Sequence, residues 1–145
     1  MKRFRFGLEK VLELRQHREE EAKNELGKAI GILANIENKI KINNENRNEA
    51  ARKRFEGIGA SGNDGFQTMI LWDSYIRRLE QEAEGLEEQA ARAELLVEEK
   101  RKLYLEASRE LKVLEKLKEK RQKEYRKEMF AVEAGEMEDM WRGNK

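Results

Sequence analysis

The sequence has 145 residues, of which 42% are charged and only 38% are hydrophobic, and it contains neither cysteine nor proline. The net charge of +1 gives no overall attraction to nucleic acid or anionic lipid, and the lack of cysteine excludes disulfides and thiolate metal sites. This composition leaves too little apolar material for a globular core. We therefore expect one all-α domain over residues 1–145, with two long helices forming an antiparallel coiled-coil hairpin.

The first predicted helix covers residues 4–56 and carries a weak apolar seam, meaning positions separated by alternating steps of four and three residues. Such a repeat keeps one narrow stripe on one side of a supercoiled helix. Nine of the thirteen positions are apolar, and Asn43 and Arg47 interrupt the seam near the expected bend. The positions are Leu8, Leu12, Arg15, Glu19, Ala22, Leu26, Ala29, Leu33, Ile36, Ile40, Asn43, Arg47 and Ala50.

A glycine-rich break over residues 57–65 separates the two predicted helices. It has four glycines in nine residues, which favours a chain reversal over a helix interior. No Lys-Ser or Lys-Thr pair follows, so the break does not fit a phosphate-binding loop. Asp64 and Gln67 have the spacing of a capping box, which predicts the start of the second helix.

An apolar cluster follows the break, and it allows two interpretations. The cluster is too wide for one seam, because about 3.6 residues complete each helical turn. Its side chains either fold over Phe55 and Ile58 to seal the tip of the hairpin, or form an exposed patch that binds another protein. The cluster consists of Phe66, Met69, Ile70, Leu71, Trp72, Tyr75 and Ile76.

The second predicted helix covers residues 66–140, and its seam is the strongest signal in the chain. Fourteen of the eighteen seam positions are apolar although the residues between them are rich in charge. The run would be roughly 90 Å long at about 1.5 Å per residue. The positions are Trp72, Ile76, Leu79, Ala83, Leu86, Ala90, Ala93, Val97, Lys100, Tyr104, Ala107, Leu111, Leu114, Lys118, Arg121, Tyr125, Glu128 and Val132.

The two arms are unequal in length, which predicts an overhang. A reversal centred near Ser61 places Ile40 opposite Glu82 and Leu8 opposite Leu114. The second helix then continues for about 40 Å without a partner from the first arm. Apolar residues of this overhang, such as Leu117 and Val132, predict self-association or insertion into a receptor.

Charge is arranged in blocks along the second helix. Residues 80–99 carry eight acidic and one basic residue, residues 100–127 carry twelve basic and five acidic residues, and residues 128–139 carry five acidic residues. Such blocks are typical of a solvated coiled-coil surface. The basic stretch 116–127 could instead bind phosphate, but interleaved glutamates oppose nucleic-acid binding.

No pattern in the sequence indicates catalysis. His17 is the only histidine and lies among charged residues, and none of the few hydroxyl residues has a base placed beside it by a recognisable motif. A solvated coiled coil also lacks the enclosed pocket that perturbs carboxylate pKa values. We expect a protein that is not an enzyme and that binds no metal and no cofactor.

The opening at residues 4–15, FRFGLEKVLELR, is the most specific motif of the chain. With the mid-chain break, the Lys/Glu-rich second helix and the acidic tail, it resembles the FliJ family, soluble components of the bacterial flagellar type III export apparatus. The resemblance covers nearly the whole chain. The family tends to carry Asp-Glu near its end, where this chain has residues 137–140, MEDM, which leaves the role of the tail carboxylates open.

The resemblance implies a function and a set of partners. Family members fold like the coiled coil of the rotary ATP synthase gamma subunit, bind the hexameric export ATPase and assist its assembly, contact the cytoplasmic domain of the export gate, and cycle export chaperones. The implied ATPase contacts are Leu8, Leu12, Arg15, Lys118, Arg121, Tyr125 and Met129. The implied gate contacts are Phe55, Phe66, Met69, Trp72 and Tyr75.

The basic N-terminus leads into no apolar stretch typical of a signal peptide, and no later segment is long and apolar enough to span a bilayer. We therefore expect a cytoplasmic protein, held at the inner face of the cell membrane only through the export apparatus. Two alternatives stay open. One is a structural spacer or homo-oligomeric coiled-coil adaptor. The other is a module that binds membrane or nucleic acid through Lys2, Arg3, Arg5 and residues 116–127.

Overall fold

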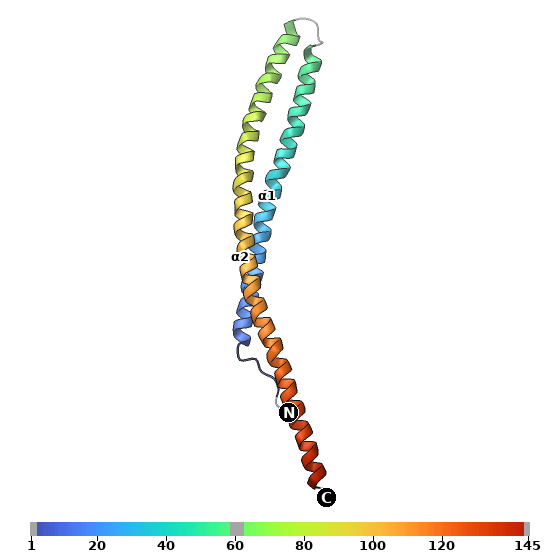
Figure 1. Ribbon diagram of the computed structural model, residues 1–145. Helices are drawn as coiled ribbons and strands as arrows, with labels where there is room; N and C mark the ends of the chain where they lie inside the picture. Colours follow the sequence, from blue (N-terminus) through green and yellow to red (C-terminus); the bar gives the residue numbers. More distant parts are fainter. Residues whose placement is uncertain (1–2, 59–62, 144–145) are drawn as a thin grey trace. The chain divides into compact units, whose positions relative to one another are not determined.

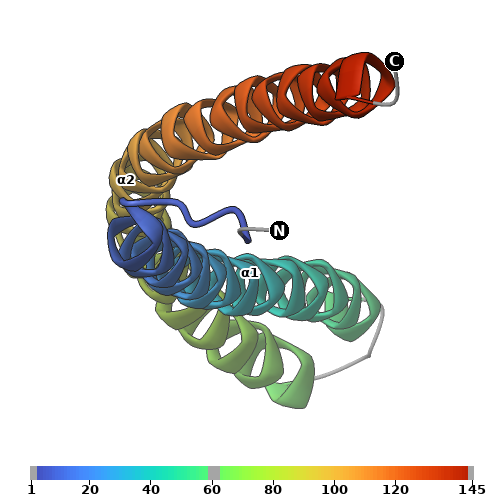
Figure 2. The same cartoon turned by 90° about the horizontal axis from the view of Figure 1, so that it is seen from below.

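The computed structural model describes residues 3–58 and 63–143, which contain two long helices and no strand (Figure 1 and Figure 2). Helix α1 spans Glu9–Ile58 with 50 residues, and helix α2 spans Asn63–Gly143 with 81 residues. The predicted all-α helical hairpin is confirmed. The chain divides into two compact units, and each unit contains part of both helices. The terminal unit is Met1–Lys23 with Lys102–Lys145, and the tip unit is Asn24–Arg101.

The helices pack along the predicted seams. Every buried hydrophobic side chain that the structure describes in α2 occupies a seam position, and in α1 the buried residues Leu12, Ala29, Asn43 and Ala50 do so too. A 3.5-residue repeat produces this result because it keeps facing positions on one side of both helices. The buried seam residues of α2 are Leu79, Ala83, Leu86, Ala93, Val97, Leu111 and Leu114.

Polar contacts between the helices fix their register within each unit. In the tip unit, the side-chain amide of Asn43 donates to the backbone carbonyl of Leu79 at 3.0 Å. In the terminal unit, Arg15 Nη1 donates to the carbonyl of Glu110 at 3.0 Å, and Lys118 Nζ lies 3.0 Å from Glu9 Oε2. These contacts agree with an antiparallel pair that reverses near residue 61.

The helix boundaries differ from the predicted ones. Helix α1 begins at Glu9 rather than residue 4 and ends at Ile58 rather than residue 56, and α2 covers Asn63–Gly143 instead of residues 66–140. Asp64, predicted to precede the second helix as its cap, therefore lies inside the first turn. Gly57, predicted to begin the turn, lies within α1, and a Cβ added there would make an ordinary contact with Thr68 Cγ2, at 3.7 Å. The remaining turn residues, 59–62, lie outside the described part of the chain.

The N-terminal segment, residues 3–8, precedes α1 and packs against α2 within the terminal unit (Figure 1). Phe6 is only 7% exposed and forms a core cluster with Leu12, Leu111 and Leu114, against which Phe4 and Leu117 pack. Extended chain advances roughly 3.3 Å per residue and a helix only about 1.5 Å. The segment can therefore cover more of α2 than one further helical turn would.

This segment corrects the predicted extent of the overhang. The rings of Phe4 and Tyr125 lie with their centroids 5.6 Å apart, and the Arg121 guanidinium lies 5.6 Å from the centroid of the Phe6 ring. The expectation that α2 lacks a partner beyond Leu114 is therefore wrong as far as Tyr125. The overhang that remains is residues 126–143.

The seam predicts the effect of a truncation at Leu86, which is 7% exposed. Leu86→Ala should lower the free energy of unfolding by about 2–3 kcal/mol, because it removes a large side chain from the core. Glu87→Ala, at an exposed neighbouring position, should change it by less than about 0.5 kcal/mol. Urea unfolding followed by circular dichroism measures both. Equal losses at the two positions would contradict the seam.

The N-terminal segment is tested in the same assay. Phe6→Ala should lower the free energy of unfolding by about 2 kcal/mol, the value expected for exposing a buried aromatic side chain. Arg5→Ala is the matched control, since Arg5 is exposed in the same segment, and should have an effect within about 0.5 kcal/mol. A Phe6→Ala protein as stable as the control would show that the segment does not pack against α2 in solution.

Candidate functional site

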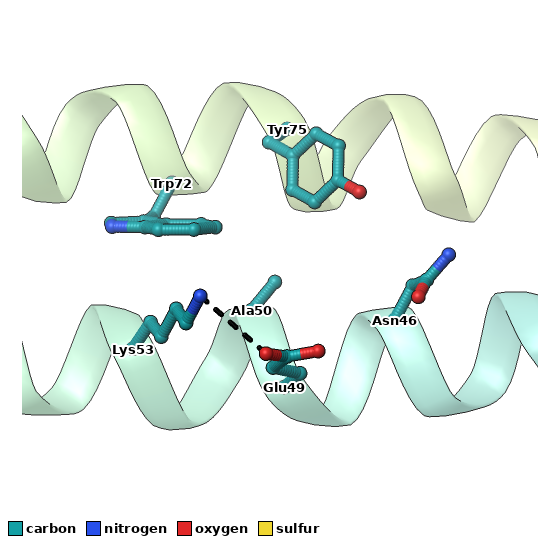
Figure 3. Close-up of a pocket in the computed structure, with 6 residues that line it drawn as sticks. All are labelled: Asn46, Glu49, Ala50, Lys53, Trp72 and Tyr75. Atoms are coloured by element: carbon teal, nitrogen blue, oxygen red, sulfur yellow. Dashed lines mark ion pairs between the residues drawn. The ribbon is translucent and has the colours of Figure 1, made fainter.

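A hollow of about 310 Å³ lies between the helices of the tip unit (Figure 3). Helix α2 contributes Trp72 and Tyr75, whose three-residue spacing places them side by side on one face. Helix α1 contributes four residues. The last three follow the first by three, four and seven positions, so all four also lie on one face. These are Asn46, Glu49, Ala50 and Lys53.

The walls of the hollow are aromatic and its rim is charged. The Trp72 and Tyr75 rings meet edge to face, with centroids 5.9 Å apart and an interplanar angle of 74°. Lys53 Nζ lies 5.7 Å from the Trp72 ring centroid and 3.4 Å from Glu49 Oε1. Opposite the rings α1 presents the methyl group of Ala50 (Figure 3). Because that side chain is small, the space in front of the rings is not filled.

Exposed apolar side chains occur on both helices near the turn. Phe55 is 76% exposed, Phe66 64% and Leu71 71%. Two of the residues predicted to seal the tip, Phe55 and Phe66, are therefore not covered within the chain, and the side chain of Ile58 lies outside the described part. The exposures favour the interpretation of the cluster as a contact patch for another protein.

The five predicted gate-contact residues all lie in the tip unit. Trp72 and Tyr75 line the hollow, Phe55 and Phe66 are exposed, and Met69 is half-buried. The structure brings the rings of Trp72 and Tyr75 into direct contact. The hollow itself was missed by sequence reasoning, because its volume depends on the size of Ala50 across the helix pair.

The seven predicted ATPase-contact residues all lie in the terminal unit. Leu12 is 3% exposed and belongs to the core between the helices, whereas Leu8 lies at the surface with 36% exposure. Five others lie on the flank or end of the helix pair. Arg15, Lys118, Arg121 and Tyr125 contact the opposite arm or the N-terminal segment, and Met129 is half-buried on α2.

Sequence reasoning missed the roles of Phe4 and Phe6. Their alternation around Arg5, followed by Gly7, is the spacing of extended chain rather than of a helix seam. That signal could have placed them outside the first helix. It could not have shown that Phe4 reaches Tyr125.

The overhang exposes a set of large apolar side chains. Phe130, Met137 and Trp141 are each more than 70% exposed, and their spacing of seven and four residues places them on one face of α2. Phe130 and Met137 lie off the seam. Acidic residues of the block 128–139 surround them, so this surface combines apolar anchors with negative charge.

Nothing in the described residues forms a catalytic arrangement. His17 Nε2 lies 3.0 Å from Glu21 Oε1, and both side chains are more than 60% exposed, so solvent surrounds this pair. Within residues 3–58 and 63–143 no group of three or more His, Cys, Asp or Glu side chains could hold a metal ion. None of the described helical segments is both long and apolar enough to cross a membrane.

Among curated proteins and solved structures, none matches this chain. The family model described as "Flagellar FliJ protein" matches residues 4–139, nearly the whole length. The match includes the N-terminal segment, both helices and most of the overhang. The chain therefore belongs to the FliJ family and is a non-catalytic, coiled-coil protein of flagellar export.

Proposed function

We propose that this protein is a coiled-coil shaft of the flagellar type III export apparatus that binds two partners through its two units. The terminal unit binds the hexameric export ATPase and assists its assembly, and the tip unit binds the cytoplasmic domain of the export gate. The observation that carries the proposal is the location of the most exposed large apolar side chains: of the nine in the described chain that are more than 60% exposed, seven lie on the overhang or near the turn.

The terminal unit suits a ring of repeated subunits. A ring presents similar loops to one asymmetric helix pair, so no single orientation can match all of them. Met137 and Met140, both exposed, are flexible and adapt to unequal surroundings. The alternating basic and acidic blocks around Lys116–Lys127 and Glu128–Asp139 add charge contacts that steer association and set orientation. Leu12 supports this surface from inside, since it is buried.

The tip unit suits a single defined contact. Its Trp72 and Tyr75 rings are held at a fixed angle, and rigid aromatic anchors beside a pocket are typical of residues that dominate binding free energy. The exposed side chains of Phe55 and Phe66 extend the apolar surface, and Lys53 and Glu49 supply charge at its rim. In this proposal the protein works in the cytoplasm, held at the inner face of the membrane by the gate, and returns empty export chaperones to use.

Removing the overhang tests the ATPase assignment. A chain ending at Lys127 keeps the contacts of Lys118, Arg121 and Tyr125, so it should retain the helicity expected for its length. It should lose stimulation of ATP turnover by the cognate export ATPase while its affinity for the gate domain changes less than about twofold. Circular dichroism, ATP turnover and gate-domain titration measure the three properties.

A second variant of the full-length chain, Glu133→Gln with Glu136→Gln, keeps the apolar anchors and removes part of the acidic block, so it separates the contribution of charge from that of the anchors. This variant should retain most of the stimulation if the anchors dominate. If the truncated chain stimulated the ATPase fully, the assignment of the overhang as the ATPase contact would be wrong.

The aromatic anchors test the gate assignment. Trp72→Ala with Tyr75→Ala should weaken gate-domain binding by about thirtyfold, the effect of losing roughly 2 kcal/mol at a binding hot spot. ATPase stimulation should be unchanged. Leu95→Ala is the control, because Leu95 is 73% exposed elsewhere on α2 in the tip unit. Equal gate affinities for the double variant and the control would rule out the Trp72 and Tyr75 rings as gate contacts.

A further inference from the structure

The two seams are mismatched in the part of the tip unit nearest the turn. Helix α1 places Asn43, Arg47 and Ala50 at consecutive seam positions, whereas α2 places Trp72 and Ile76 at seam positions there. Apolar side chains on α2 therefore face polar or small ones on α1. Farther from the turn, α2 buries five of its six apolar seam residues between Leu79 and Val97, all but the half-buried Ala90: Leu79, Ala83, Leu86, Ala93 and Val97.

Asn43 marks the end of the mismatched stretch that lies farther from the turn. It is 3% exposed and the only buried polar residue in the described chain, and its amide group donates to the Leu79 carbonyl at 3.0 Å. Its Oδ1 atom is buried and has no hydrogen-bond partner among the described residues. A buried acceptor without a partner destabilises the closed state, whereas the directional bond to Leu79 defines the register.

Two more features of the same stretch weaken the contact between the helices. Arg47 Nε is also buried without a hydrogen-bond partner in the described part of the chain. The hollow beside Ala50 leaves about 310 Å³ where core side chains would otherwise make contacts, and unfilled space forfeits the attraction between packed atoms. Across the mismatch, Arg54 Nε lies 2.5 Å from Asp73 Oδ1. This pair is partly exposed, and such pairs contribute little.

We propose that the part of the tip unit beyond Asn43, residues 44–58 and 63–78, opens locally while the rest of the helix pair stays closed. Asn43 is the boundary, because its bond to Leu79 ends the well-packed seam. Opening uncovers the apolar face of α2 at Trp72 and Ile76, which the closed state covers in part. This inference rests on the proposed function in one respect: the open form is the one that binds the gate domain.

Hydrogen exchange of the full chain tests the opening without any partner. Asn43→Leu replaces the buried polar group with an apolar side chain at a seam position, so it should slow amide exchange over residues 44–57 and 66–78 by about tenfold or more. The control is Asn38→Leu, the same substitution at an exposed site in α1, which should leave these rates within about twofold. Unchanged or faster exchange in Asn43→Leu would overturn the proposal.

A covalent lock tests the same opening independently of packing at Asn43. The chain has no native cysteine, so Arg54→Cys with Asp73→Cys can be joined by a short bis-maleimide. The matched control is the same double variant capped with N-ethylmaleimide. The joined protein should exchange the tip amides more slowly than the capped one, and equal rates would overturn the proposal.

Gate-domain binding then links the opening to the function. If only the open fraction binds, affinity falls in proportion to that fraction, so Asn43→Leu and the joined variant should each bind at least about tenfold more weakly than their controls. Slower exchange with unchanged or tighter binding would overturn the claim that the open form binds. If neither the native chain nor any variant binds the gate domain, the proposed function fails, while the exchange rates still decide whether the tip opens.

Discussion

Burial of one narrow stripe on each helix is the constraint on which the rest of this structure depends. Eleven hydrophobic residues in the described chain are buried, and four of them are alanines: Ala29, Ala50, Ala83 and Ala93. Two helices in contact can cover only the side chains that face each other, so stability is spread thinly along the pair. Each seam residue is then supported mainly by its neighbours on the facing helix. A polar or small residue in one seam consequently affects its own stretch of the pair and little else.

The same constraint explains how the protein can offer binding surfaces without a globular core. All faces of both helices outside the seam are free for charge or for contact with partners, and the charge blocks along α2 use most of that area. Large apolar side chains outside the seam have no other helix to cover them. Most of those that are more than 60% exposed in the described chain lie where the pairing ends, near the turn at Phe55 and Phe66 and on the overhang at Phe130 and Trp141.

The terminal unit shows that α2 still has a contact partner beyond Glu9, the first residue of α1. Phe4 and Phe6 continue the contact with α2 in the non-helical segment before α1, so Tyr125 acquires an aromatic partner beyond the first turn of α1. The Tyr125 hydroxyl is buried with no hydrogen-bond partner among the described residues. The contact of Tyr125 with Phe4 is between the two rings, and nearby the Arg121 guanidinium faces the Phe6 ring. In the tip unit, Asn43 lowers the stability of the helix pair but defines its register. This is the best-attested role of a single buried polar residue in a coiled coil.

The sequence by itself determined the fold class, the seam of each helix and the family. The seam of each helix follows from the 3.5-residue repeat, which depends only on the order of neighbouring residues in the chain. The family resemblance follows from the FRFGLEKVLELR opening, which can be recognised without any tertiary contact. The tertiary structure decided that Phe4 reaches Tyr125, that the Asn43 amide finds the Leu79 carbonyl, and that a hollow opens between Ala50 and Trp72. Those features depend on distances between side chains that are 22 to 121 residues apart in the chain. Helix periodicity fixes which face a residue occupies, but the size and reach of the residue opposite fix what it touches.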